Sequence, residues 1–246
     1  MNTGRGWTGQ RVAAFRDRTE ESALVARHVE LAKADPEHLV VFEVLGVAGA
    51  GKSRFLAEVA AQARADQATP ISVSLTNEAV MTSLAPLLAL RSGLPLDCWL
   101  FDTALLAYWA ETDRPDLAIG AEGVSRAEQV AIEIGVPLNF AMEVYASLPR
   151  DRALSRGYSL ATFADIDALR ARPPELLAAL PQYLGRDVRS RSRSPELHGL
   201  VVLYDAYDRQ DANTLAERTP WLRTFIAAAG TGVHIIAARD PLGWGD

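Results

Sequence analysis

Four short runs of apolar residues predict the strands of this protein. Each run is rich in β-branched or aliphatic side chains and is bounded by polar or turn-forming residues, which is typical of strands buried on both faces of a parallel sheet. The second run, which starts at Pro70, is the weakest of the four. The runs are 38–45, 70–75, 199–204 and 233–238.

Between the strands, apolar residues recur at helical spacing and predict helices. A helix over 19–34 ends before Pro36, because the residue that precedes a proline is biased away from helical geometry. A helix over 52–66 places its apolar residues on one face, and a helix over 212–229 separates the last two strands.

Residues 77–191 contain no convincing strand, and their start and stop signals predict a block of helices. The signals are a cap at Asn77 with Gly93 after the end, a helix from Asp102 through Trp109, a capping box of Ser125 and Glu128 with Gly135 at the stop, and segments at about 138–148, 161–171 and 174–190.

The order of these elements predicts the fold class. A chain of 246 residues amounts to one large domain or two small ones at about 100–200 residues per domain. Alternation of strands and helices predicts an α/β fold with a parallel sheet and flanking helices. We expect this domain over 19–246, with a large helical insertion at about 77–191 between the second and third strands. Residues 1–18 are polar and form an N-terminal segment.

Composition narrows the classes of function. Apolar residues make up 49% and charged residues 23%, and the net charge of −6 gives no reason to expect nucleic-acid binding over the whole chain. Cys98 is the single cysteine, which excludes an internal disulfide and a cysteine-based zinc cluster. The N-terminus lacks the apolar core of a secretory signal, and no apolar stretch reaches about 18 residues, so we expect a cytoplasmic protein without a membrane span.

Basic residues show two unusual features. Only Lys33 and Lys52 among the 25 basic residues are lysine, so a lysine within a functional motif stands out. The one charge-biased stretch, 186–193, contains four arginines. We interpret it as a solvated loop between a helix and a strand, with a phosphate or partner contact as the alternative.

A glycine-rich motif lies between the first strand and the second helix. It fits the pattern G-x-x-x-x-G-K-[ST] of the P-loop, and it has the required context of a buried strand before it and a helix after it. Glycines let backbone N–H groups surround phosphates, and the helix N-terminus adds partial positive charge. The motif consists of Gly46, Val47, Ala48, Gly49, Ala50, Gly51, Lys52 and Ser53, and Arg54 follows it.

Side chains of this motif and of the third strand predict a magnesium–phosphate site. Lys52 is expected to contact the β- and γ-phosphates, and the Ser53 hydroxyl to bind Mg²⁺. A P-loop also requires an acidic residue at the end of another buried strand, and Asp205 follows the third run. Asp205 is therefore predicted to hold Mg²⁺, directly or through water, and the alternative is an aspartate that only caps the next segment.

Two further polar residues are candidates for catalysis or sensing. Asp208 either orients water or acts as a general base, or it is a solvated structural acid, and both interpretations stay open. Arg239 ends the fourth strand, at the edge where α/β sheets bind ligands, and a guanidinium there can sense the γ-phosphate. The alternative is a surface arginine that pairs with Asp240.

Together these residues resemble the STAND class of P-loop ATPases, which are NB-ARC-like, multidomain signalling switches. Residues 15–21 are similar to the F-x-x-R-x-x-E element that precedes the ATPase core. Residues 205–208 resemble the D-T-Y-E form of the Walker B segment, and 235–240 resemble the strand that ends in the sensor arginine. The segment around 101–115 is similar to one in the same bacterial subgroup. The resemblance covers about 15–246.

The resemblance implies binding of ATP or ADP with Mg²⁺, with Phe15 and Arg18 at the nucleotide base. It also implies slow hydrolysis, a conformational switch, and protein partners or self-association. The chain departs from the family in having Asp208 in place of Glu and Ala238 in place of Gly. Family members continue with a fifth strand, so we expect a truncated module or a fragment, with an unpaired edge on strand 38–45 that promotes self-association.

Two other functions remain open. A P-loop kinase or transferase for small molecules would use the helical block as a substrate lid and would transfer phosphate to an acceptor. A nucleotide-binding module without hydrolysis would bind its nucleotide tightly without turnover and would act through its partners.

Overall fold

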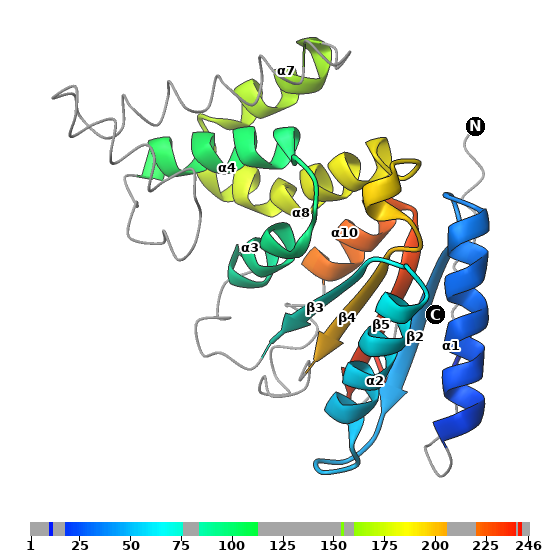
Figure 1. Cartoon of the computed structure of the whole chain (residues 1–246). Coiled ribbons are helices and arrows are strands. Elements are labelled where there is room, and N and C mark those ends of the chain that lie inside the picture. The colour runs from blue at the N-terminus through cyan, green and yellow to red at the C-terminus, as the bar shows by residue number, and fades with distance from the viewer. Residues whose placement is uncertain are drawn as a thin grey trace, which may run out of the picture. The chain divides into compact units, whose positions relative to one another are not determined.

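Five parallel strands form a sheet in the order β1-β2-β5-β4-β3 (Figure 1). The computed structural model describes residues 10–11, 18–75, 84–112, 154, 160–205, 220–239 and 241–242. The mixed α/β class with a parallel sheet, expected from the alternation of elements, is confirmed. The strands are β1 (Gln10–Arg11), β2 (Leu39–Leu45), β3 (Pro70–Ser74), β4 (Val201–Asp205) and β5 (Gly232–Ala238).

The central strand of the sheet is β5, which pairs with β2 on one side and with β4 on the other. Ile235 lies opposite Phe42 of β2 and opposite Leu203 of β4. All seven residues of β5 are buried. A strand with neighbours on both sides and covered faces favours apolar side chains, which explains the apolar run in the sequence, interrupted by His234 alone.

The strand β1 was not expected from the sequence. Gln10 pairs with Phe42 and Arg11 with Glu43, on the outer edge of β2. The expectation that this edge is unpaired is therefore wrong at these two positions. Strand pairing uses backbone groups alone. A polar segment without hydrophobic alternation can therefore add to a sheet edge, although no pattern in the sequence predicts it.

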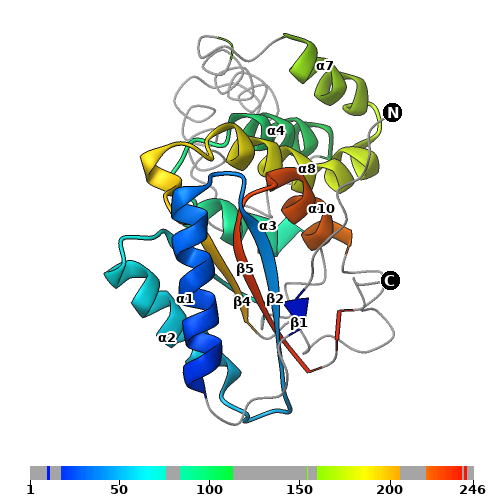
Figure 2. The same ribbon diagram turned by 90° about the vertical axis from the view of Figure 1, so that its right-hand side faces the viewer.

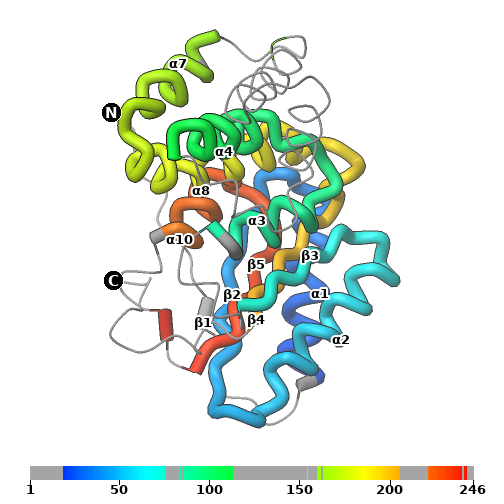
Figure 3. The backbone as a smooth tube through the Cα atoms, turned by 90° about the vertical axis from the view of Figure 1, so that its left-hand side faces the viewer, coloured from blue at the N-terminus to red at the C-terminus, as the bar shows by residue number. Residues whose placement is uncertain are grey.

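The sheet belongs to the first of two compact units, which comprises Met1–Pro95, Arg191–Pro220 and Gly230–Asp246. Helices α1 (Arg18–Ala34) and α2 (Lys52–Ala65) pack side by side on one face of the sheet (Figure 2). Their apolar residues join those of the strands in one core. Helix α3 (Leu84–Gly93) lies beside β3 (Figure 3), and a short 3-10 helix, η3 (Pro195–Leu197), precedes β4.

The second unit, Leu96–Ser190 with Trp221–Ala229, is helical in its described residues. It contains α4 (Trp99–Thr112), α7 (Leu160–Leu169), α8 (Pro173–Ser190) and most of α10 (Pro220–Ala229). Helix α4 packs along α8, and α7 contacts both. Among the described residues, no helix combines the length and the apolar composition that crossing a bilayer requires.

The helix boundaries follow the sequence signals closely, with two corrections. Residues 186–190, which we expected in a solvated loop, form the last part of α8. Helix α4 begins at Trp99, three residues before Asp102, which we expected to open it. The carboxylate that caps this helix belongs to Asp187, 87 residues away along the chain. The expected starts at Asn77 and 212, and the expected segments around 125–135 and 138–148, lie outside the described residues.

A polar pair is enclosed between β4 and β5. The rings of Tyr204 and His234 stack with their centroids 6.2 Å apart, and the tyrosine hydroxyl lies 3.3 Å from the imidazole Nδ1. Nε2 of His234 lies 3.0 Å from the carbonyl oxygen of Thr231, so it carries the proton and donates it there. Burial lowers the pKa of His234 to about 4 and raises the pKa of Tyr204, so both groups are neutral near pH 7.

Candidate functional site

The glycine-rich loop 46–51 connects the end of β2 to the start of α2 at the carboxyl edge of the sheet. Gly49 and Gly51 have φ angles of 80° and 77°, in the left-handed region that favours glycine. Gly51 directly precedes α2, and no side chain caps the helix there. The loop is largely exposed, and the side chain of Val47 is 76% accessible.

Several backbone N–H groups of this loop are free to bind a ligand. Gly46 donates to the carbonyl of Ala238 at 3.2 Å, and Ala50 donates to Val47 at 3.2 Å. The N–H groups of Val47, Ala48, Gly49 and Gly51 donate to no acceptor in the described part of the chain. Free N–H groups and the positive end of a helix dipole together favour an anion at the start of α2.

The side chain of Lys52 folds back over the loop. Its ammonium group donates to the carbonyl oxygen of Gly46 and lies 3.3 Å from that of Val47. An ammonium carries three donors, so Lys52 is held above the loop by carbonyl groups and keeps donor capacity for a further acceptor. A phosphate seated in the loop would offer charged oxygens in place of neutral carbonyls, and these make the stronger hydrogen bonds.

Ser53 and Asp205 meet at the same edge, as the sequence predicts for two ligands of one ion. The Ser53 hydroxyl donates to Oδ1 of Asp205 at 3.0 Å across a sequence separation of 152 residues. Neighbouring ligands of an octahedral Mg²⁺ with bonds of about 2.0–2.1 Å lie about 2.9 Å apart. The two oxygens therefore fit adjacent positions around Mg²⁺.

Protein groups alone do not complete a metal site here. Within the described residues, no cluster of three or more histidine, cysteine, aspartate or glutamate side chains is placed to hold a metal ion. Magnesium commonly binds through one or two protein oxygens together with phosphate oxygens and water. The pair of Ser53 and Asp205 matches that mode of binding.

Arg239 follows β5 directly and is exposed. The hydrogen bond from Gly46 to Ala238 joins the residue before Arg239 to the first residue of the glycine-rich loop. Since β5 lies between β2 and β4, Arg239 follows the strand that separates the loop from Asp205. This backbone position is the one expected for an arginine that contacts a phosphate in the loop.

Of the four other predicted site residues, Arg54 is the one whose side chain the structure describes. Asp208 and Phe15 lie outside the described residues, as does the side chain of Arg18, the first residue of α1. Arg54 is 79% accessible, and its Nε donates to Glu58 at 2.9 Å along the surface of α2. Arg54 is therefore engaged on its own helix.

Two residues at this edge were missed by the sequence analysis. Ser74, the last residue of β3, lies opposite Asp205 in the sheet register, and the next N–H, of Leu75, donates to the Asp205 carbonyl at 3.0 Å. Oε2 of Glu43 accepts from the N–H of Leu242 at 3.3 Å. The sequence signals that could have found them are the polar Ser74 at a strand end and the charged Glu43 within an apolar run.

Comparisons with known proteins do not add to this geometry. No model of a protein family matches the chain, and neither a curated protein nor a solved structure matches it. The functional argument consequently depends on the residues at the carboxyl edge of the sheet.

Proposed function

We propose that this protein binds Mg·ATP and Mg·ADP through residues 46–53 and acts as a nucleotide-dependent conformational switch with slow hydrolysis. One observation carries the proposal: the uncapped start of α2, with free loop N–H groups, lies beside the paired oxygens of Ser53 and Asp205. An anion and a divalent cation are needed side by side to satisfy both features, and a nucleotide phosphate with Mg²⁺ supplies them.

Each group at this edge has a role in the proposed complex. The loop N–H groups and the N-terminal start of α2 bind the phosphates through backbone groups. Lys52 exchanges its loop carbonyls for phosphate oxygens. Ser53 and Asp205 would hold Mg²⁺, which would supply positive charge to offset that of the phosphate oxygens.

Slow turnover follows from the acids available near the site. Asp205 is engaged with Ser53, and its neighbour is Ala206, so no second carboxylate stands beside it in the sequence. Asp208 is the nearest acid that follows, and it would act on the attacking water. Arg239 would contact the γ-phosphate, which is present in ATP and absent in ADP, and so couple the nucleotide state to the end of β5.

Calorimetric titration with Mg·ATP and Mg·ADP tests the site directly. Lys52→Ala should weaken binding by about 1.5–3 kcal/mol, the range for a hydrogen bond to a charged group. Arg64→Ala is the matched control, because it removes one positive charge from the last turn of α2, at the other end of the helix that begins with Lys52. Unchanged affinity in a folded Lys52→Ala protein would overturn the proposal.

The fate of the γ-phosphate separates the switch from its two alternatives. Slow release of inorganic phosphate supports the proposed ATPase switch. Tight binding without any release would indicate a non-hydrolysing binding module, and transfer of labelled phosphate to a small acceptor would indicate a kinase or transferase.

A further inference from the structure

A pocket opens at the amino edge of the sheet, where the strands begin. Its volume is about 560 Å³, within the range of about 300–1,000 Å³ that is usual for small-molecule sites. The end of α1, the turn after α2 and the segment 192–199 line it. All three belong to the same compact unit as the glycine-rich loop, which lies at the other end of the strands.

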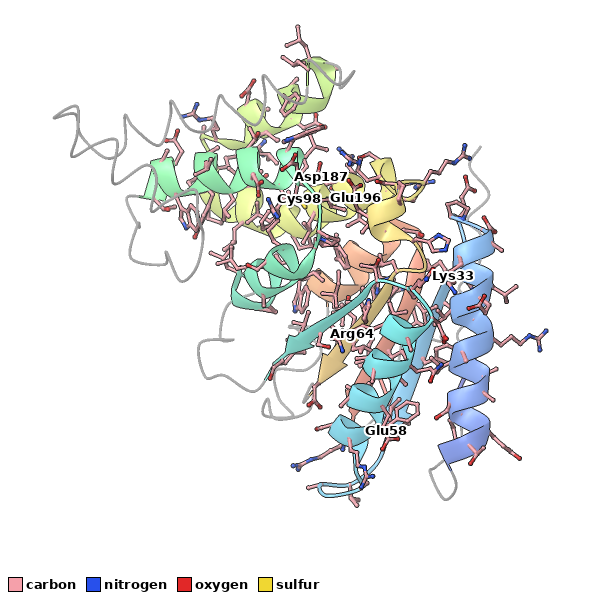
Figure 4. The ribbon with its side chains drawn as sticks, in the orientation of Figure 1. Lys33, Glu58, Arg64, Cys98, Asp187 and Glu196 are labelled. Carbon is pink, nitrogen blue, oxygen red and sulfur yellow. The ribbon has the colours of Figure 1, made fainter. Side chains whose placement is uncertain are left out.

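The side chains that line this amino-edge pocket are basic or neutral. Lys33 and Arg193 are the charged ones, Gln67 and Ser192 offer neutral donors, and no aspartate or glutamate is among the lining residues. Lys33 comes from the last turn of α1, at the end of that helix where the strands begin (Figure 4).

The ion pairs around the pocket leave Arg193 unpaired. Lys33 pairs with Glu30 at 2.6 Å, and Arg191 pairs with Glu196 at 3.0 Å. No carboxylate of the described residues pairs with Arg193. Because each nearby pair uses one cation for one carboxylate, the guanidinium of Arg193 is the surplus positive charge at this pocket.

Helix dipoles do not account for this surplus. The C-termini of α1 and α2 lie near the pocket and carry partial negative charge, which disfavours an anion. Lys33 and Arg64 stand in the last turns of these two helices and offset that charge. Arg193 belongs to neither helix, so its charge remains available to a ligand.

The pocket wall contains a residue in a costly backbone conformation. Gln67 has φ of 61°, the one positive φ of a non-glycine residue in the described chain. It follows the end of α2, where the N–H of Ala68 donates to Ala63 and that of Gln67 to Arg64. This hydrogen-bonding pattern is a Schellman motif, in which glycine is the usual residue at the left-handed position. The sequence thus places an amide side chain on the pocket wall where glycine would be more stable.

Gly199, which also lines the pocket, fixes the position of Lys33. Gly199 has φ of 58°, and a Cβ atom there would lie 2.6 Å from Cγ of Lys33. The stem of Lys33 therefore lies against the backbone at Gly199, and the side chain is only 17% accessible. Its ammonium donates once to Glu30 and keeps two further donors.

We propose that the amino-edge pocket binds a small phosphate monoester, at a site separate from the glycine-rich loop. The planar fork of Arg193 suits two phosphate oxygens, and Lys33 supplies a second positive charge. Arg193 carries the unpaired charge and Lys33 keeps free donors beside its bond to Glu30, so a phosphate dianion is favoured over a monoanion because its oxygens are the stronger acceptors. The amide of Gln67 is a neutral donor at the wall, and the remaining volume takes the organic part of the ester.

Titration of the full chain with phenyl phosphate at pH 8 tests this site. We expect saturable binding of one equivalent of phenyl phosphate. The affinity should be at least tenfold lower in Arg193→Ala. The wild-type chain should bind the monoanion benzenesulfonate at least threefold more weakly than phenyl phosphate. Arg64→Ala is the matched control, because it removes the same charge from the last turn of α2 without touching the lining. Inorganic phosphate measures how much of the affinity comes from the phosphate group alone.

The variant Gln67→Gly separates a ligand role from a structural one. Release of the left-handed strain should raise the melting temperature by about 2 °C, the shift expected for about 1 kcal/mol in a chain of this size. Loss of the amide should at the same time weaken phenyl phosphate binding about threefold or more. A gain in stability with unchanged binding would overturn the role of Gln67 in the proposed site.

Lys52→Ala distinguishes this site from the glycine-rich loop. Phenyl phosphate binding should survive in Lys52→Ala and be lost in Arg193→Ala, whatever the two variants do to Mg·ATP. Loss of phenyl phosphate binding in Lys52→Ala, absence of binding by the wild-type chain, or equal binding by Arg193→Ala and wild type would each overturn the proposal.

Discussion

Two helices of this protein begin in opposite ways. The start of α4 is closed by Asp187 of α8, whose carboxylate accepts from the N–H groups of Leu100 at 3.2 Å and Phe101 at 2.9 Å (Figure 4). The start of α2 has no side-chain cap and directly follows an exposed glycine-rich loop. Asp187 is fully buried.

The difference shows how the same physical requirement is met by the protein or left to a ligand. The first N–H groups of every helix lack partners within the helix. In α4 the residue before the helix is Cys98, whose carbonyl accepts from Asp102 but whose side chain is a weak acceptor, so a distant carboxylate takes the place of the cap. In α2 the corresponding place stays open, which is the property that an anion-binding helix needs.

Removal of the internal cap should give the largest effect. Asp187→Ala leaves two buried N–H groups without their acceptor and should lower the free energy of unfolding by about 3–5 kcal/mol. Asp187→Asn keeps one carbonyl oxygen and should cost less, about 1–2 kcal/mol. Urea unfolding followed by tryptophan fluorescence measures this, since Trp99 and Trp109 both lie in α4.

A rescue experiment makes this test specific to the cap. Sodium formate should restore part of the stability of Asp187→Ala, because it returns a carboxylate to the start of α4, whereas sodium chloride at equal ionic strength should restore less. Asp165→Ala removes an exposed acid of α7 as a control and should change stability by less than about 0.5 kcal/mol. Equal stability of Asp187→Ala and the control would show that the cap is unimportant.

The buried imidazole of His234 should give the next effect, through pH. Its pKa is about 4 in the folded protein, against 6.5 for an unperturbed histidine, so the unfolded chain binds a proton more readily between these values. Stability is therefore full above pH 6.5 and falls as the pH is lowered toward 4, by about 3 kcal/mol at 1.36 kcal/mol per pKa unit.

The variant His234→Gln isolates this contribution. Burial also lowers the pKa of His28 and His38, so the wild-type loss in this range includes their share. Chemical denaturation at pH 7, 6, 5 and 4 should show a steeper loss for the wild type than for His234→Gln. Parallel pH profiles of the two proteins would show that His234 is not the cause of the loss of stability at low pH.

The smallest expected effect concerns the open helix start and its neighbours. Arg239→Ala should weaken ATP binding more than ADP binding, by about 1–2 kcal/mol for one lost charged contact. Asp208→Asn should change turnover but leave the ratio of the two affinities nearly the same, since a carboxylate favours neither nucleotide unless Mg²⁺ or water intervenes.

Calorimetric affinities for both nucleotides on both variants decide between these residues. An unchanged ratio in Arg239→Ala would indicate a surface arginine without a sensing role. Loss of discrimination in Asp208→Asn would instead assign the sensing to the segment that follows β4.

Local patterns in the sequence were sufficient for most elements of the fold. The apolar runs located β2, β3, β4 and β5 to within two residues, because a strand buried on both faces requires apolar side chains throughout. The glycine pattern located the turn before α2, since positive φ angles are cheap only for glycine. The candidate ligands Ser53 and Asp205 were found in the same way, as residues at the ends of predicted elements.

Contacts between distant residues were decided only by the tertiary structure. The position of β5 between β2 and β4, the addition of β1 and the meeting of Ser53 with Asp205 depend on backbone pairing, which leaves no periodic mark on the sequence. Asp187 belongs to the stretch 186–193, which we interpreted as a solvated loop, and Asp102 looked like the residue that opens α4. Packing reversed that expectation, because a buried N–H donates to the carboxylate that lies nearest in space, whatever its distance along the chain.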